Sequence, residues 1–305
     1  MLGYLTHEDC RRHDPGTIHP EAPIRLEAIE NQLIASGLDL VLDRHEAPLA
    51  TREQLARVHA TEHIEHVFAS APTRGSVALD GDTIMSPGSL QAALRAAGAG
   101  VHAVDLIMGG TLSNAFCAVR PPGHHATRTA AMGFCIFDNV AVAAAHAMAE
   151  YGLARVAIVD FDVHHGNGTE DIFADDSRVL FCSSFQHPFY PHSGFDGRTR
   201  NLIAVPLPAG SDGDGFRAAI SASWLPALES FAPQFVFVSA GFDGHALDDM
   251  SDTRLVEADY RWVTERIVEI ANRHAQGRLV SMLEGGYEPD VLARCVVAHL
   301  KALLD

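Results

Sequence analysis

The chain has 305 residues, of which 47% are hydrophobic and 20% are charged, and its formal net charge is −17 at pH 7. This length and apolar content allow a full buried core within a single α/β domain. The acidic balance argues against a nucleic-acid-binding protein, which normally presents a basic face, and would favour the approach of cationic substrates.

The start of the chain and its cysteines indicate a cytoplasmic protein. The polar residues His7-Glu8-Asp9 come too early for a secretory signal, and no run approaches the ~18 uncharged apolar residues of a membrane helix. The five cysteines are odd in number and lack a C-x-x-C spacing, which favours free thiols in a reducing compartment.

Along the chain, apolar segments rich in β-branched residues alternate with longer segments of helical periodicity. Helices are predicted at 24–36, 52–70, 88–109, 138–151, 213–230, 254–274 and 289–304. Strands are predicted at 38–42, 114–119, 156–161, 179–185, 201–206, 235–240 and 279–283.

Two of the predicted strands indicate the kind of sheet. The runs 156–159 and 235–238 are continuously apolar rather than alternating, as expected of parallel strands that helices cover on both faces. Alternation of such strands with helices predicts one α/β domain over residues 1–305, with a mainly parallel central sheet and helices on both faces. Ligands of such folds bind beyond the carboxyl ends of the strands.

Four short polar segments follow predicted strands, so one pocket could collect them all. They are Arg120-Pro121-Pro122-Gly123-His124-His125, Asp160-Phe161-Asp162-Val163-His164-His165-Gly166-Asn167, Gly241-Phe242-Asp243-Gly244 and Glu284-Gly285-Gly286-Tyr287. Together they contain the residue types of a zinc amidohydrolase site, namely metal ligands, a histidine pair for proton transfer and a phenol.

Asp162 and His164 are the first candidates for metal ligands. In an extended segment, residues i and i+2 point to the same side, so both side chains could face one ion. Asp243 follows the strand predicted at 235–240 and could supply a third ligand. Two carboxylates and one imidazole suit zinc, with one position left open for water or substrate. Asp160 shares that face and is expected to orient a neighbouring side chain.

His124 and His125 are candidates for the general acid and base. The prolines and glycine before them make a rigid turn, which would hold both imidazoles in a fixed direction. Unequal partners could divide the two roles, because Asp160 would raise the pKa of one imidazole and the neutral Asn167 would leave the other lower. Tyr287 follows two glycines and could donate its phenolic proton to a developing oxyanion.

These motifs together resemble those of the histone deacetylase-type zinc hydrolases, which have the arginase/deacetylase fold. The resemblance runs from His19-Pro20-Glu21 to Gly285-Gly286-Tyr287 and covers nearly the whole chain. It implies one catalytic zinc and removal of acetyl or related acyl groups from the ε-amine of lysine in proteins or peptides, with release of acetate. The zinc ligands would be Asp162, His164 and Asp243, and the catalytic residues His124, His125, Tyr287, Asp160 and Asn167.

The resemblance also implies features around the zinc. A substrate tunnel would be lined by Gly133, Phe134, Tyr190 and Met250, and Arg25 would lie in an internal cavity from which acetate could leave. A structural potassium ion would lie near Asp160, Asp162, His164, Ser183 and Ser184, partly through main-chain oxygens.

Several positions depart from the commonest pattern of that family. Asn167 stands where class I members have Asp, and Gly-Phe-Asp replaces their Gly-Ala-Asp, so the chain resembles a class II-like bacterial member. Tyr190 stands where Phe is usual, which predicts a different tunnel polarity. Ser183-Ser184-Phe185-Gln186 replaces the common Ser-Leu-His at the expected potassium site.

Three other functions are open at this stage. An acetylpolyamine deacetylase of the same fold would act on acetylated small amines; Met250 stands where its gate glutamate is expected, although Asp248-Asp249 lie close by. A binuclear manganese ureohydrolase would need a further carboxylate where the chain has His245. A non-catalytic acyl-lysine reader would not need the acid/base pair. No nucleic-acid or membrane partner is expected, and the oligomeric state is left open.

Overall fold

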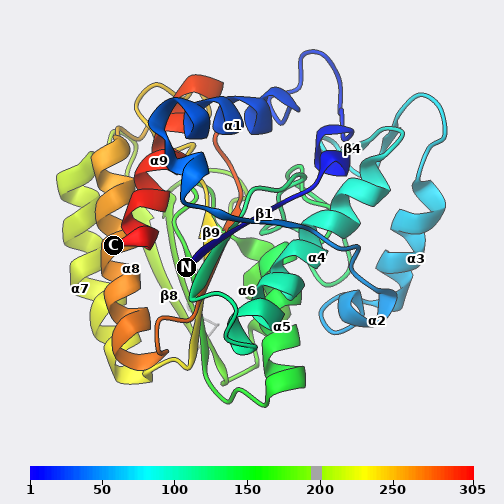
Figure 1. Cartoon of the computed structure of the whole chain (residues 1–305). Helices are drawn as coiled ribbons and strands as arrows, with labels where there is room; N and C mark the ends of the chain where they lie inside the picture. Colours follow the sequence, from blue (N-terminus) through cyan, green and yellow to red (C-terminus); the bar gives the residue numbers. More distant parts are fainter. Residues whose placement is uncertain (194–200) are drawn as a thin grey trace.

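The most apolar segments of the chain form the central strands. β6 (Val156–Asp160), β9 (Phe235–Ala240) and β10 (Leu279–Leu283) are buried at every residue. The computed structural model, which describes residues 1–193 and 201–305, places them in an eight-stranded sheet of order β2-β1-β5-β10-β9-β6-β7-β8 (Figure 1). Every neighbouring pair in this sheet is parallel. The predicted α/β fold with a parallel central sheet is therefore confirmed.

The other strands of the sheet are β1 (Leu2–Thr6), β2 (Asp43–Glu46), β5 (Asn114–Cys117), β7 (Val179–Gln186) and β8 (Leu202–Leu207). The strand predicted at 38–42 is wrong. Gly37 adopts φ 73° at the end of α1 and the chain continues as a 3-10 helix over Leu38–Leu40, so the strand begins only at Asp43. The strand at Leu2–Thr6 was not predicted.

Helices cover both faces of the sheet (Figure 1). One layer contains α4 (Ser89–Met108), α5 (Asn139–Tyr151) and α6 (Asn167–Phe173). The other contains α1 (Ile24–Ser36), α7 (Gly213–Phe231), α8 (Glu257–His274) and α9 (Pro289–Leu304). None of the helices described in 1–193 and 201–305 is long and apolar enough to cross a membrane.

The helix predicted at 52–70 is two helices, α2 (Arg52–Leu55) and α3 (Thr61–Ser70). Between them the chain turns around buried His59, whose ring bonds the carbonyl of Thr127 at 2.9 Å and the backbone N–H of Asp138 at 2.9 Å. These long-range bonds favour the turn over a continuous helix. The short hairpin of β3 (Val77–Ala78) and β4 (Ile84–Met85) was also not predicted.

The strand order explains why four segments far apart in sequence meet. β5, β10, β9 and β6 are consecutive neighbours in the sheet, and one polar segment follows each of them. Because the strands are parallel, all four segments leave the same edge of the sheet. The five cysteines are all buried free thiols, as their number and spacing predicted.

Candidate active site

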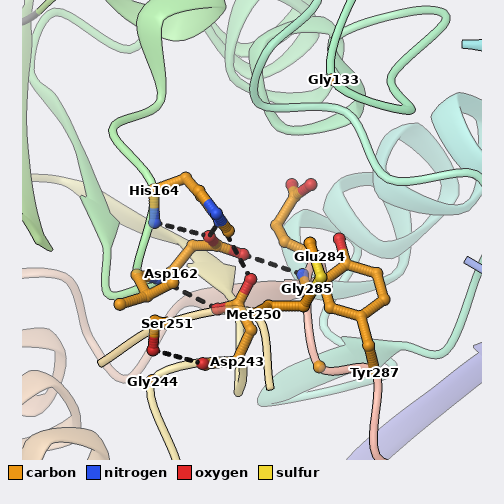
Figure 2. A network of polar contacts seen from close by, with 12 residues as sticks. Gly133, Asp162, His164, Asp243, Gly244, Met250, Ser251, Glu284, Gly285 and Tyr287 are labelled. Atoms are coloured by element: carbon orange, nitrogen blue, oxygen red, sulfur yellow. Dashed lines mark hydrogen bonds and ion pairs between the residues drawn. The ribbon is translucent and has the colours of Figure 1, made fainter. Parts of the chain in front are cut away.

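A buried cluster of two carboxylates and one imidazole forms the metal site. His164 Nδ1 lies 3.1 Å from Asp162 Oδ1 and 3.1 Å from Asp243 Oδ2. The three ligand atoms lie within 4.8 Å of one another, and Figure 2 shows the three side chains turned toward a common point. This donor set fits the residues that bind zinc in proteins, because two oxygens and one nitrogen leave a fourth position open.

The loop after β10 closes one side of the metal site. The backbone N–H of Gly285 donates to Asp162 Oδ2 at 2.8 Å, and the N–H of Val163 donates to Asp243 Oδ1 at 3.1 Å. A Cβ atom on Gly285 would lie 2.2 Å from Asp243 Oδ2 and 2.6 Å from Asp162 Oδ2. Only glycine therefore lets this loop approach both carboxylates (Figure 2).

His124 and His125 lie beside the metal site with different partners. Their rings are 4.0 Å apart, and both side chains are buried. His124 Nδ1 lies 2.9 Å from Asp160 Oδ2, whereas His125 Nδ1 lies 2.8 Å from Asn167 Oδ1. Since the amide oxygen can only accept, His125 carries its proton on Nδ1, and Nε2 is left with its lone pair.

These partners separate the proton affinities of the two imidazoles. Burial alone would lower the pKa of His124, but the carboxylates of Asp160 and Asp162 raise it well above its ordinary value. Burial and the positive charge of His124 hold the pKa of His125 well below its ordinary value. The pair therefore consists of one cationic and one neutral imidazole near neutral pH.

Tyr287 presents its phenol from the loop after β10. Arg25 lies over its ring, 4.9 Å from the centroid, and Phe134 meets it edge-on at 5.7 Å and 83°. Burial raises the pKa of Tyr287 well above its ordinary value, although the charge of Arg25 lowers it. The phenol is thus protonated and able to donate a hydrogen bond.

Several of the residues predicted to line a tunnel lie against this site. The ring of Tyr190 is 5.2 Å from that of His125, at 85°. A Cβ atom on Gly133 would lie 2.5 Å from His125 Cδ2 and 3.0 Å from the Tyr190 hydroxyl, so this position also requires glycine. Phe189, which was not singled out from the sequence, stacks on His164 at 5.3 Å and 21°.

Arg25 and Ser183, which was predicted to lie near potassium, are both fully buried. Arg25 donates to the carbonyls of Glu284 at 2.5 Å and Gly286 at 2.6 Å. Asp160 and Ser183 are partners on neighbouring strands, and the Ser183 hydroxyl bonds His165 Nδ1 at 2.9 Å. The fold therefore brings the ends of β6 and β7 together at this point.

Three acidic residues contribute to the site although none of them was predicted as a catalytic or binding residue. Glu284 Oε2 accepts the N–H groups of Gly123 at 2.7 Å and His124 at 3.2 Å, and burial raises the pKa of its carboxyl to about 8. Asp82 accepts the N–H of Gly133 at 3.2 Å. Asp248 contacts the loop of Tyr287. The signal for Glu284 was its place at the start of a polar segment, directly after a strand.

The fold and this site together define a metal-dependent hydrolase of the α/β class. The chain belongs to the histone deacetylase domain family, whose pattern matches residues 19–303. It is 39% identical to the histone deacetylase-like amidohydrolase of Pseudomonas aeruginosa, over 93% of this chain and 77% of that protein. It is 35% identical to the probable deacetylase of Archaeoglobus fulgidus, over 94% of this chain and 81% of that protein.

A solved structure supports the same assignment. The crystal structure of the HDA15 HD domain matches with a TM-score of 0.93 and 33% sequence identity, and covers 99% of this chain and 88% of that one. The protein is thus a hydrolase of the deacetylase family with a buried Asp-His-Asp metal site.

Proposed function

We propose that the protein is a single catalytic domain that removes acetyl or related acyl groups from the ε-amine of lysine in proteins or peptides. The observation that carries the proposal is the pairing of His124 with Asp160 and of His125 with Asn167, beside the Asp162/His164/Asp243 cluster. Amide hydrolysis needs a base for water and a proton for the leaving amine, and the neutral His125 can do both in turn while the cationic His124 stabilises developing negative charge.

Zinc held by Asp162, His164 and Asp243 would polarise the scissile carbonyl and acidify water. His125 accepts a proton from the attacking water at Nε2, because Asn167 holds the proton of Nδ1, and then passes that proton to the leaving amine. His124, with its pKa raised by the neighbouring carboxylates, acts mainly by electrostatic stabilisation. The Tyr287 hydroxyl donates to the oxygen on which negative charge develops.

The other residue roles that the family resemblance implies belong to the same proposal. Phe134 and Tyr190 would line a tunnel for the acyl-lysine stem together with Gly133 and Met250. Arg25 would receive acetate in an internal cavity. One potassium ion would be held near Asp160, Asp162, His164, Ser183 and Ser184; the pairing of Asp160 with Ser183 supports its placement between β6 and β7.

Lysine in a peptide is favoured over an acetylated polyamine as the substrate. A polyamine would need a free negative charge beside its distal amine, and Met250 provides none. Asp248 is buried and its carboxylate is engaged by backbone N–H groups, which leaves Asp249 as the exposed acid of that pair. The name of one relative, a histone deacetylase-like amidohydrolase, supports this choice.

A panel of acetyl-lysine peptides, longer acyl-lysine peptides and acetylpolyamines, assayed with the purified zinc enzyme, tests the proposal. We expect acetyl-lysine peptides to be hydrolysed at least as efficiently as acetylpolyamines, measured as kcat/KM. A hundredfold preference for acetylspermidine over every peptide would instead assign the protein to the polyamine branch. Binding of acetyl-lysine without turnover would make it a reader.

A further inference from the structure

Asp248 is a buried carboxylate that links two loops of the site. It lies five residues after the metal-binding Asp243, in the loop after β9, and is 5% exposed. Its Oδ1 accepts the N–H of Met250 in its own loop at 3.0 Å. Its Oδ2 accepts the N–H groups of Tyr287 at 2.6 Å and Glu288 at 3.1 Å, in the loop after β10.

The loop that carries Tyr287 is held at three successive residues. The N–H of Gly285 is bound by Asp162, the carbonyl of Gly286 by Arg25 at 2.6 Å, and the N–H of Tyr287 by Asp248. The bond from Asp248 is made at the residue that bears the phenol itself. Figure 2 shows Tyr287 beside the metal ligands, at the end of this loop.

We propose that Asp248 is a positioning residue that fixes the Tyr287 hydroxyl for the reaction. This inference rests on the proposed function, in which that hydroxyl donates to the developing oxyanion. Asp248 does not touch the reacting atoms. It acts through the backbone of Tyr287. The same carboxylate also holds the backbone of Met250, which is a predicted tunnel residue.

The contacts explain why a carboxylate is required at position 248. Its two oxygens accept three N–H groups, and an ionised acceptor makes roughly twice as strong a bond as a neutral one. Two of those N–H groups, of Tyr287 and Glu288, immediately precede α9, where the helix dipole favours a negative charge. An asparagine has one accepting oxygen, so its NH2 group would face an N–H group and push one loop away.

A double-mutant cycle tests the proposal, with kcat, KM and zinc content measured for each enzyme. Asp248→Asn should lower kcat by ~10–100-fold, because a misplacement of about 1 Å can cost ~100-fold in rate. KM and zinc content should change little. In the Tyr287→Phe background, the same Asp248→Asn change should lower kcat by less than about threefold, since no hydroxyl is left to position.

Asp249→Asn is the matched control, because Asp249 lies in the same loop and loses the same charge but is exposed. Its kcat should equal that of the unchanged enzyme. If Asp248→Asn does not fold, Asp248→Ser serves in the same cycle, since its shorter side chain cannot reach both loops.

Three results would overturn the proposal. Equal losses from Asp248→Asn in the unchanged enzyme and in the Tyr287→Phe variant, or a loss confined to KM or zinc content, would show a merely structural role while leaving the proposed function intact. Near-normal kcat in Tyr287→Phe alone would remove the oxyanion role of the phenol, and with it the positioning role of Asp248.

Discussion

At the scale of single residues, the two adjacent histidines differ mainly in what holds their Nδ1 atoms. The carboxylate of Asp160 favours a cationic His124, and the amide of Asn167 leaves His125 neutral. Both partners were predicted from the sequence, because they lie within one polar segment that follows β6. The difference between a carboxylate partner and an amide partner thus gives two chemically identical side chains different proton affinities.

We expect His125→Ala to lose more activity than His124→Ala. A general base contributes ~10²–10⁴-fold to the rate, so His125→Ala should lower kcat by that range, while His124→Ala keeps a base and loses only electrostatic stabilisation. Steady-state kinetics at matched zinc content measure both. A larger loss in His124→Ala would exchange the two roles.

Tyr287→Phe should lower kcat by ~10²–10³-fold, as expected for the loss of one oxyanion donor. The ring is retained, so its contacts with Arg25 and Phe134 should persist and zinc content should be unchanged. Kinetics combined with metal analysis separate this outcome from loss of the metal. Unchanged turnover would contradict the donor role.

At the scale of secondary-structure elements, features within one segment could be predicted from the sequence better than contacts between two segments. Asp162 and His164 follow one strand, so their common face could be inferred from the alternation of an extended chain. The contact of Asp248 with Tyr287 joins residues 39 apart in sequence, and no local pattern predicts it. The break at His59 escaped prediction for the same reason, since its partners belong to distant loops.

One buried contact between α8, α9 and β10 should affect how the free energy of unfolding depends on pH. His299 of α9 lies buried between Thr264 of α8 and Ser281 of β10, at 2.6 and 2.9 Å. Burial lowers its pKa from 6.5 to about 3. Above pH 6.5 it is neutral in both the folded and unfolded states. Between pH 6.5 and 3 only the unfolded state binds the proton, so this group destabilises the fold as the pH falls.

Replacement of His299 by Gln removes that proton uptake. Below pH 6.5 the unfolding free energy of the His299→Gln variant should fall less steeply than that of the unchanged protein, by up to about 1.4 kcal/mol per pH unit. Urea unfolding at about pH 7.5, 6.0 and 5.0, with zinc at equal saturation, measures the difference. If the unfolding free energies of the two proteins changed with pH in parallel over the whole range, the lowered pKa of His299 would be contradicted.

At the scale of the whole molecule, the parallel strand order is what makes one site from four segments. The sequence predicted the segments and the class of sheet, but not the order in which the strands lie. That order places β5, β10, β9 and β6 side by side through pairings between strands as far apart in sequence as β5 and β10. Such pairings depend on long-range packing, whereas each polar segment is readable from a few neighbouring residues.

We expect the metal to stabilise the whole fold as well as to support catalysis. Two buried carboxylates, Asp162 and Asp243, repel each other unless a cation lies between them and His164. A ligand that binds only the folded state, at a free concentration of 100 times its Kd, adds about 2.7 kcal/mol to the free energy of unfolding. Chelation should therefore lower Tm and abolish activity, and one equivalent of zinc per chain should restore both. Asp243→Ala should lose this zinc-dependent rise in Tm, whereas a rise that persists in the variant, or two transition-metal ions per chain, would contradict the single three-ligand site.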